Sequence, residues 1–183
     1  MKSLVAYFSR AGGNYAGGNI VNLSRGNTEI IANKIKEFTN GDIFQIRTPN
    51  PYPDDYRKTV EIAKEELNND LRPELAEMLD SINDYDTIYV GYPNWCGTMP
   101  MAVFKFLESY DFSGKTIVPF CTHEGSGFGG SIYDIQRLCP DSKILEGIAV
   151  RGGDAGSSDA HKKVEFYLKE EGLINYDLQK TSE

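Results

Sequence analysis

Five short apolar runs are spread along the chain, and each is rich in residue types that favour β-strands. They lie at residues 4–8, 42–46, 87–92, 116–121 and 144–150. Most of them are continuous apolar stretches rather than alternations of apolar and polar positions. Continuous stretches are typical of strands that helices cover on both faces of a parallel sheet. We therefore predict five strands of this kind.

The segments between these runs carry apolar residues three and four positions apart, which predicts amphipathic helices. The first begins at Asn27, where Asn27 or Thr28 can cap the helix and where Ile31 and Ile35 share one face. Further helices are predicted at residues 56–68, 73–82, 100–109, 131–138 and 158–171.

Strands that alternate with helices predict the α/β class, here a doubly wound five-stranded parallel sheet in three layers. Residues 1–174 are predicted to form one domain, because the chain has no internal repeat and no second core. Residues 175–183 are predicted to be a polar C-terminal tail. In open parallel sheets, ligands bind beyond the carboxyl ends of the strands. The loops that follow the strands are therefore the candidate sites.

Composition narrows the range of ligands. The 183 residues include 19 Lys and Arg against 27 Asp and Glu, which gives a net charge of −8. This balance argues against binding to nucleic acid, which requires a basic surface.

No apolar run approaches the length of a membrane span, and the first residues do not form a signal peptide. The three cysteines are odd in number and form no CxxC pair, so we expect a reducing, cytoplasmic location and no membrane association.

The loop after the first strand leads into a helix and carries hydroxyl side chains at both ends, Ser9 and Thr28. Backbone N–H groups and hydroxyls at a helix start favour a bound phosphate. The GxxxxGK[ST] pattern is missing, which favours a phosphate monoester over a triphosphate. The alternative is a plain turn capped by Asn27 and Thr28.

The loop after the third strand, residues 93–97, holds the only tryptophan, Trp95. A planar ligand stacked on Trp95 would account for an aromatic side chain there, although the ring can also fold back onto the core or onto a partner surface. The loop after the fourth strand contains GxGxxG at Gly125, Gly127 and Gly130. This dinucleotide fingerprint belongs after the first strand, so we favour glycines that let the backbone approach a ligand.

Other chemistries have weaker support. The histidines and cysteines of the sequence do not show the paired spacing that is typical of metal ligands. Cys96 and His123 form the only plausible nucleophile–base pair, and that alternative stays open. A phosphoacceptor receiver domain would need acidic residues where Ser9 and Asn94 stand.

Together, the three loops make residues 1–172 resemble the flavodoxin superfamily, and in particular its FMN proteins with a long first loop. The similarity is carried by Ser9, Gly26-Asn27-Thr28-Glu29, Pro93-Asn94-Trp95-Cys96-Gly97-Thr98-Met99-Pro100 and Thr122-His123-Glu124-Gly125-Ser126-Gly127. Residues 13–25 interrupt the loop that is normally contiguous in this family. They are expected to form either a small hairpin over the cofactor or a mobile loop.

This resemblance implies the strand order 2-1-3-4-5 and a noncovalent FMN. The residues it implies for cofactor binding are Ser9, Arg10, Ala11, Asn27, Thr28, Pro93, Asn94, Trp95, Cys96, Gly97, Thr122, His123, Glu124, Gly125 and Gly127. His123 and Glu124 are the candidate catalytic proton donors.

Three functions fit the resemblance. The first is an FMN oxidoreductase, of NAD(P)H:quinone type, acting on a small quinone-like acceptor. The second is a one-electron carrier that docks a basic redox partner protein through its acidic surface. The third is a non-redox FMN-binding module. The oligomeric state stays open.

Overall fold

A parallel sheet forms the middle layer of the molecule. The computed structural model describes residues 1–175, and its main sheet has the order β4-β1-β5-β6-β7, with β8 also paired to β6. The strands are β1 (Ser3–Tyr7), β4 (Asp42–Gln45), β5 (Thr87–Pro93), β6 (Thr116–His123), β7 (Lys143–Ile144) and β8 (Ile148–Arg151). All of these pairings are parallel. The predicted fold class and the 2-1-3-4-5 order are therefore confirmed.

The predicted fifth strand, residues 144–150, is divided into β7 and β8. Leu145 donates its N–H to the Ile117 carbonyl, so the backbone N–H and C=O groups of Ile117 point toward the last strand. The backbone of Pro119, two residues further along β6, points toward the same neighbouring strand, but proline has no N–H to donate. At this break, Gly147 has a φ of 83°, and a Cβ there would lie 2.3 Å from the Pro119 carbonyl oxygen. The missing donor and the tight contact together explain the division.

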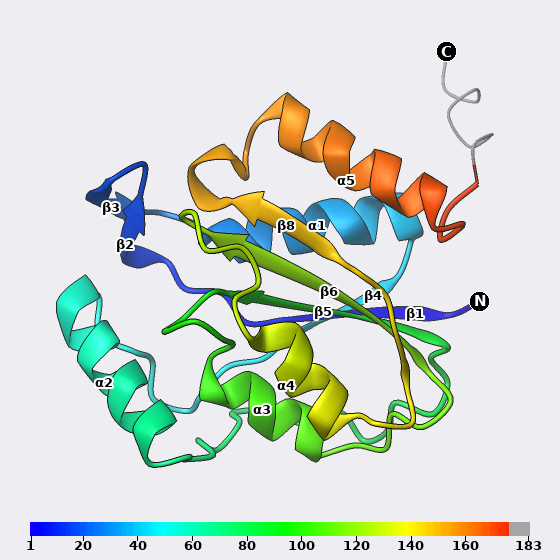
Figure 1. The fold of residues 1–183 in the computed structure, drawn as a ribbon, viewed down its shortest axis with the longest axis horizontal. Coiled ribbons are helices and arrows are strands. Elements are labelled where there is room, and N and C mark those ends of the chain that lie inside the picture. Colours follow the sequence, from blue (N-terminus) through cyan, green and yellow to red (C-terminus); the bar gives the residue numbers. More distant parts are fainter. Residues whose placement is uncertain (176–183) are drawn as a thin grey trace.

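Helices cover both faces of the sheet, so the predicted three layers are present. Figure 1 shows α1 (Asn27–Thr39) and α5 (Ser158–Glu170) on one face, with α3 (Met101–Glu108) and α4 (Ser131–Leu138) on the other. Each face buries its own apolar cluster. The remaining helix, α2 (Tyr56–Asn68), stands beside the carboxyl ends of the strands, and a short 3₁₀ turn, η1 (Gly152–Asp154), follows β8.

The predicted helix at residues 73–82 is wrong, because this segment is irregular. Its backbone donors bond to distant partners instead of to one another. Ala76 donates to the Arg47 carbonyl, and Leu79 donates to the Tyr110 hydroxyl at 2.7 Å. Leu75, Leu79 and Ile82 still pack against the core, with Ile82 fully buried. The periodic pattern therefore reflects burial without a helix.

The insertion after β1 forms an antiparallel hairpin of β2 (Gly12–Ala16) and β3 (Asn19–Leu23). Its turn has two glycines with positive φ, Gly17 at 61° and Gly18 at 85°, as a type I′ turn requires. The hairpin is separate from the main sheet and stands at the carboxyl ends of the strands (Figure 1). Of the two expectations for residues 13–25, the hairpin is the one that forms.

No helix within residues 1–175 combines the length and the apolar character needed to cross a bilayer. Apart from Asn175, the predicted polar tail lies outside the described residues.

Candidate functional site

A cavity of about 300 Å³ opens at the carboxyl ends of β1, β5 and β6. The predicted site residues that line it are Ser9, Arg10, Asn27, Thr28, Pro93, Asn94, Trp95, Cys96, Thr122, His123 and Glu124. Those that lie outside its lining are Ala11, Gly97, Gly125 and Gly127. Residues that the sequence did not single out complete the wall: Asn14, Tyr15, Tyr56, Thr59, Val60, Ala63, Lys64 and Gly152.

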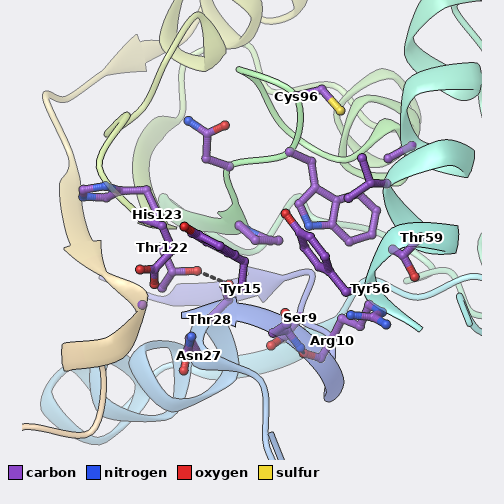
Figure 2. A pocket seen from close by; sticks show the side chains of 18 of the residues that line it. Ser9, Arg10, Tyr15, Asn27, Thr28, Tyr56, Thr59, Cys96, Thr122 and His123 are labelled. Carbon is purple, nitrogen blue, oxygen red and sulfur yellow. Dashed lines mark hydrogen bonds between the residues drawn. The ribbon is translucent and has the colours of Figure 1, made fainter. Parts of the chain in front are cut away.

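The N-terminus of α1 forms one end of the cavity, where Asn27 and Thr28 line the wall (Figure 2). The N-cap residue is Gly26, which has no side chain and so cannot cap the helix. Instead, Ser9 Oγ accepts a hydrogen bond from the Glu29 N–H at 3.0 Å. The expectation that Asn27 or Thr28 caps the helix is therefore wrong, because the end of β1 supplies the acceptor. The first-turn N–H groups and the helix dipole favour an anion at this position.

Two buried hydroxyls meet at the same end. Thr28 Oγ1 and Thr122 Oγ1 lie 2.7 Å apart, and one of their two hydroxyl hydrogens is used in that bond. The other hydrogen remains available to a ligand. The Ser9 hydroxyl is also available as a donor, because its oxygen already accepts from the backbone. A Cβ at Gly26 would lie 2.1 Å from Ser9 Oγ, so only glycine allows this close approach.

Trp95 lines the cavity from the loop after β5. Its ring makes edge contacts with Phe8, at 5.1 Å between centroids, and with Tyr52, at 5.0 Å. The Tyr52 hydroxyl in turn donates to the Glu66 carboxylate at 2.8 Å. The ring therefore packs against Phe8 and Tyr52, as the second sequence interpretation expects, and it also forms part of the wall, while a planar ligand stacked on Trp95 stays a prediction. The neighbouring rings keep this aromatic surface in place.

A second pair of rings comes from the hairpin in the insertion after β1 and from the start of α2. Tyr15 of β2 and Tyr56, the first residue of α2, stack with their centroids 6.1 Å apart and their planes 29° apart. Figure 2 shows both side chains in the cavity region, with the hydroxyl side chains of Ser9 and Thr28 nearby. Strand-end reasoning missed both tyrosines because neither comes directly after a parallel strand. The only sequence signal was the long insertion that carries Tyr15.

The loop after β5 turns at two residues with positive φ, Cys96 at 53° and Gly97 at 84°. Such values are typical of a type I′ turn. The Asn94 side chain accepts from the Gly97 N–H at 3.1 Å and donates to the Gly127 carbonyl at 2.8 Å. Gly97 and Gly127 thus lie outside the lining but are hydrogen-bonded to a residue that belongs to it.

His123 lies at the end of β6. Its Nδ1 accepts a hydrogen bond from the Gly125 N–H at 2.9 Å, so the neutral ring carries its hydrogen on Nε2. Burial, followed by the charge of Arg151, lowers the pKa of His123 below its ordinary value. At neutral pH the side chain is therefore an uncharged imidazole that can donate from Nε2.

The cysteine–histidine alternative loses support. Desolvation raises the pKa of the Cys96 thiol, so this side chain stays protonated at neutral pH and is a weak nucleophile. Among the hydrogen bonds of residues 1–175, none joins Cys96 to His123, whose Nδ1 is already bonded to backbone.

Glu124 and Arg10 are both engaged by backbone. The Glu124 carboxylate accepts from the N–H groups of Gly17 and Gly153, at 2.9 and 3.2 Å. The Arg10 guanidinium donates to the carbonyls of Pro53 and Asp54, the latter at 2.9 Å. Burial lowers the pKa of Arg10, and the nearby Asp54 opposes this shift. Both charged side chains therefore join segments of the wall.

The fold and this cavity together define a three-layer α/β protein with a ligand pocket at the carboxyl edge of its parallel sheet. The model of the flavodoxin family matches residues 2–165, so the chain belongs to that family. The predicted membership of the flavodoxin superfamily is confirmed. No curated protein sequence matches the chain.

Solved structures agree with this placement. The chain is similar to a candidate flavoprotein from Bacteroides uniformis, with 28% identity, a TM-score of 0.71, and coverage of 92% of this chain and 97% of that one. A flavoprotein from Lactobacillus acidophilus, in complex with FMN, is 20% identical with a TM-score of 0.60, over 84% and 95% of the two chains. Oxidised flavodoxin 2 from Bacillus cereus is 17% identical with a TM-score of 0.52, over 91% and 94%. The last two show a shared fold.

Proposed function

We propose that this protein binds FMN noncovalently in the cavity and acts as a cytoplasmic oxidoreductase toward a small quinone-like acceptor. The observation that carries the proposal is that one cavity joins the N-terminus of α1 to an aromatic wall. A phosphate monoester linked to a planar ring needs both features. Support also comes from family membership and from the FMN complex of the Lactobacillus acidophilus flavoprotein. The three free cysteines agree with a reducing compartment.

The residues at the α1 end fit a phosphate group. Donors are available from the Ser9 hydroxyl, the Thr28–Thr122 hydroxyl pair and the first-turn N–H groups of α1. Glu29, the acidic residue of the first turn, is paired with Arg25 at 3.1 Å, which reduces its repulsion of a phosphate. A dianion would also be stabilised by the helix dipole.

The aromatic end fits a planar ring. Trp95, Tyr15 and Tyr56 would hold the ring system by apolar contact and exclude water from it. When bound, FMN supplies the one-electron and two-electron chemistry. The contribution of the chain would be to orient the cofactor and to donate hydrogen bonds to the bound groups. His123 suits this role because Nδ1 is held by Gly125 and the neutral ring can donate a hydrogen bond from Nε2.

A direct experiment is the absorbance spectrum of the purified protein. We expect a yellow protein that retains FMN, and a combined Thr28→Ala and Trp95→Ala variant that loses most of it. Tyr133→Ala is a suitable control, because this aromatic side chain is 69% exposed and lies on α4, outside the cavity lining. A colourless protein that fails to bind added FMN would overturn the proposal.

The second candidate is a one-electron carrier for a basic partner protein, and the net charge of −8 favours it. The two candidates differ in turnover. Rapid NAD(P)H oxidation with a quinone as acceptor is expected for the oxidoreductase. Absence of turnover, with fast electron exchange with a basic redox protein that slows as salt is added, would favour the carrier instead.

A further inference from the structure

The β2–β3 hairpin is attached to the body of the protein at its base. The Arg10 guanidinium donates to the carbonyls of Gly13 and Pro53, and to that of Asp54 at 2.9 Å. The Gly13 N–H donates to the same Asp54 carbonyl at 2.9 Å. A Cβ at Gly13 would lie 2.5 Å from that oxygen, so the hairpin backbone rests directly on the segment before α2.

The tip of the hairpin is attached at a second point, through the side chain of Glu124. Glu124 Oε2 accepts from the N–H of Gly17, in the hairpin turn, at 2.9 Å. Glu124 Oε1 accepts from the N–H of Gly153, in η1, at 3.2 Å. A Cβ built on Gly153 would lie 3.9 Å from the Gly17 nitrogen, so the tip and η1 are near neighbours. One carboxylate therefore joins them.

Between these attachments the hairpin carries Tyr15, which lines the cavity and stacks on Tyr56 of α2. A two-stranded hairpin has little stability of its own in water, so its position depends on its attachments. Hydrogen bonds from N–H groups to a carboxylate are about twice as strong as those between neutral groups. Loss of the Glu124 contact would thus free the tip and, with it, this part of the cavity wall.

We infer that Glu124 is a positioning residue: its carboxylate fastens the hairpin tip to η1 and so keeps Tyr15 in the wall of the FMN pocket. The inference rests on the proposed FMN function. It also replaces the expectation that Glu124 donates a proton. Each carboxylate oxygen accepts one backbone N–H, so both oxygens take part in the contact between the hairpin tip and η1.

The first test needs no cofactor. In Glu124→Gln, only one side-chain oxygen remains, so one of the two amides loses its acceptor. We expect the ¹⁵N–¹H signals of Gly17 and Gly153 to shift, and amide exchange to become about tenfold faster at whichever of the two loses its acceptor. Asp154→Asn is the matched control, because it removes one negative charge next to Gly153 without touching this contact. Unchanged amide exchange at both Gly17 and Gly153 in Glu124→Gln would overturn the inference.

The second test measures FMN release from the purified holoprotein. Glu124→Gln and Tyr15→Ala are each expected to speed release about tenfold, as loss of about one charged hydrogen bond or one ring contact would. If Glu124 acts through the hairpin, the double variant releases FMN no faster than the quicker single variant. The inference would be overturned if the rate increases of the two single variants multiplied in the double variant. It would also be overturned if Glu124→Gln released FMN at the wild-type rate. Should the wild type bind no FMN, the proposed function fails, while amide exchange at Gly17 and Gly153 still decides whether Glu124 holds the hairpin.

Discussion

Several side chains of the cavity are oriented by backbone groups far away in the sequence. Ser9 is fixed by the N–H of Glu29, twenty residues later, and Glu124 by that of Gly17, 107 residues earlier. Such bonds determine what each side chain can still do. Ser9 keeps a hydrogen to donate, whereas each oxygen of Glu124 accepts a backbone N–H. The role of a polar residue therefore depends on its remaining capacity for hydrogen bonds more than on its type.

His123 provides a pH-dependent prediction at this scale. Its pKa is lowered in the folded protein, so the unfolded chain takes up the proton first as the pH falls below about 6.5. Folding stability is expected to decrease over that range. In His123→Gln this contribution disappears, and the midpoint of urea unfolding, measured between pH 7.5 and 5 on the cofactor-free protein, should fall less steeply than in wild type. Parallel curves for the two proteins would contradict the prediction.

At the scale of elements, close contacts between neighbouring strands restrict which residues are tolerated. Gly91 of β5 lies against the ring of Phe120 in β6, and both are buried. A Cβ on Gly91 would meet Phe120 Cζ at 2.0 Å. The division of the last strand has a similar origin, in Pro119 and Gly147. The sheet is thus shaped locally by contacts that a hydrophobic pattern does not describe.

Gly91→Ala tests this packing. The added methyl group has to displace the Phe120 ring inside a full core, which is expected to cost about 1–3 kcal/mol in the free energy of unfolding. Gly156→Ala is the control, because Gly156 has open space around it and no positive φ. The control should change stability by about 0.5 kcal/mol or less. Chemical denaturation measures both, and equal effects of the two substitutions would contradict the packing argument.

At the scale of the whole molecule, the cavity exists because separate elements converge at one edge of the sheet. Loops after β1, β5 and β6 supply one part of its wall, α2 another, and the hairpin a third. A ligand that bridges these parts binds the folded protein and not the unfolded chain. Binding therefore stabilises the entire fold.

This linkage predicts a difference between FMN and riboflavin, which has the same ring but no phosphate. At a free FMN concentration 100 times its Kd, the free energy of unfolding should rise by about 2.7 kcal/mol. Riboflavin at the same concentration should stabilise the protein less, since the α1 terminus gains no anion. Thr28→Ala should narrow the difference between the two ligands, as measured by urea unfolding. Equal stabilisation by both ligands would show that the phosphate does not bind at α1.

The order of strands and helices was predictable from the sequence because it follows from short-range patterns. Apolar runs and helical spacing located the strands and most helices, and strand ends located Ser9, Thr28, Trp95 and Thr122 in the cavity wall. The residues 73–82 were predicted wrongly, since burial imposed a helical period on a segment whose backbone bonds lie elsewhere. The spacing of apolar residues indicates which side chains are buried, but it does not indicate which acceptor each backbone N–H bonds to.

The tyrosine pair and the role of Glu124 depended on the tertiary structure. Tyr15 and Tyr56 belong to a hairpin and a helix that no local pattern places beside each other, and Gly17 reaches Glu124 only after the sheet has formed. Contacts between segments so far apart arise from the packing of whole elements, because local sequence does not encode the direction in which a hairpin leaves the sheet. The sequence thus specified the elements and one end of the pocket, and the packing of those elements closed the other end.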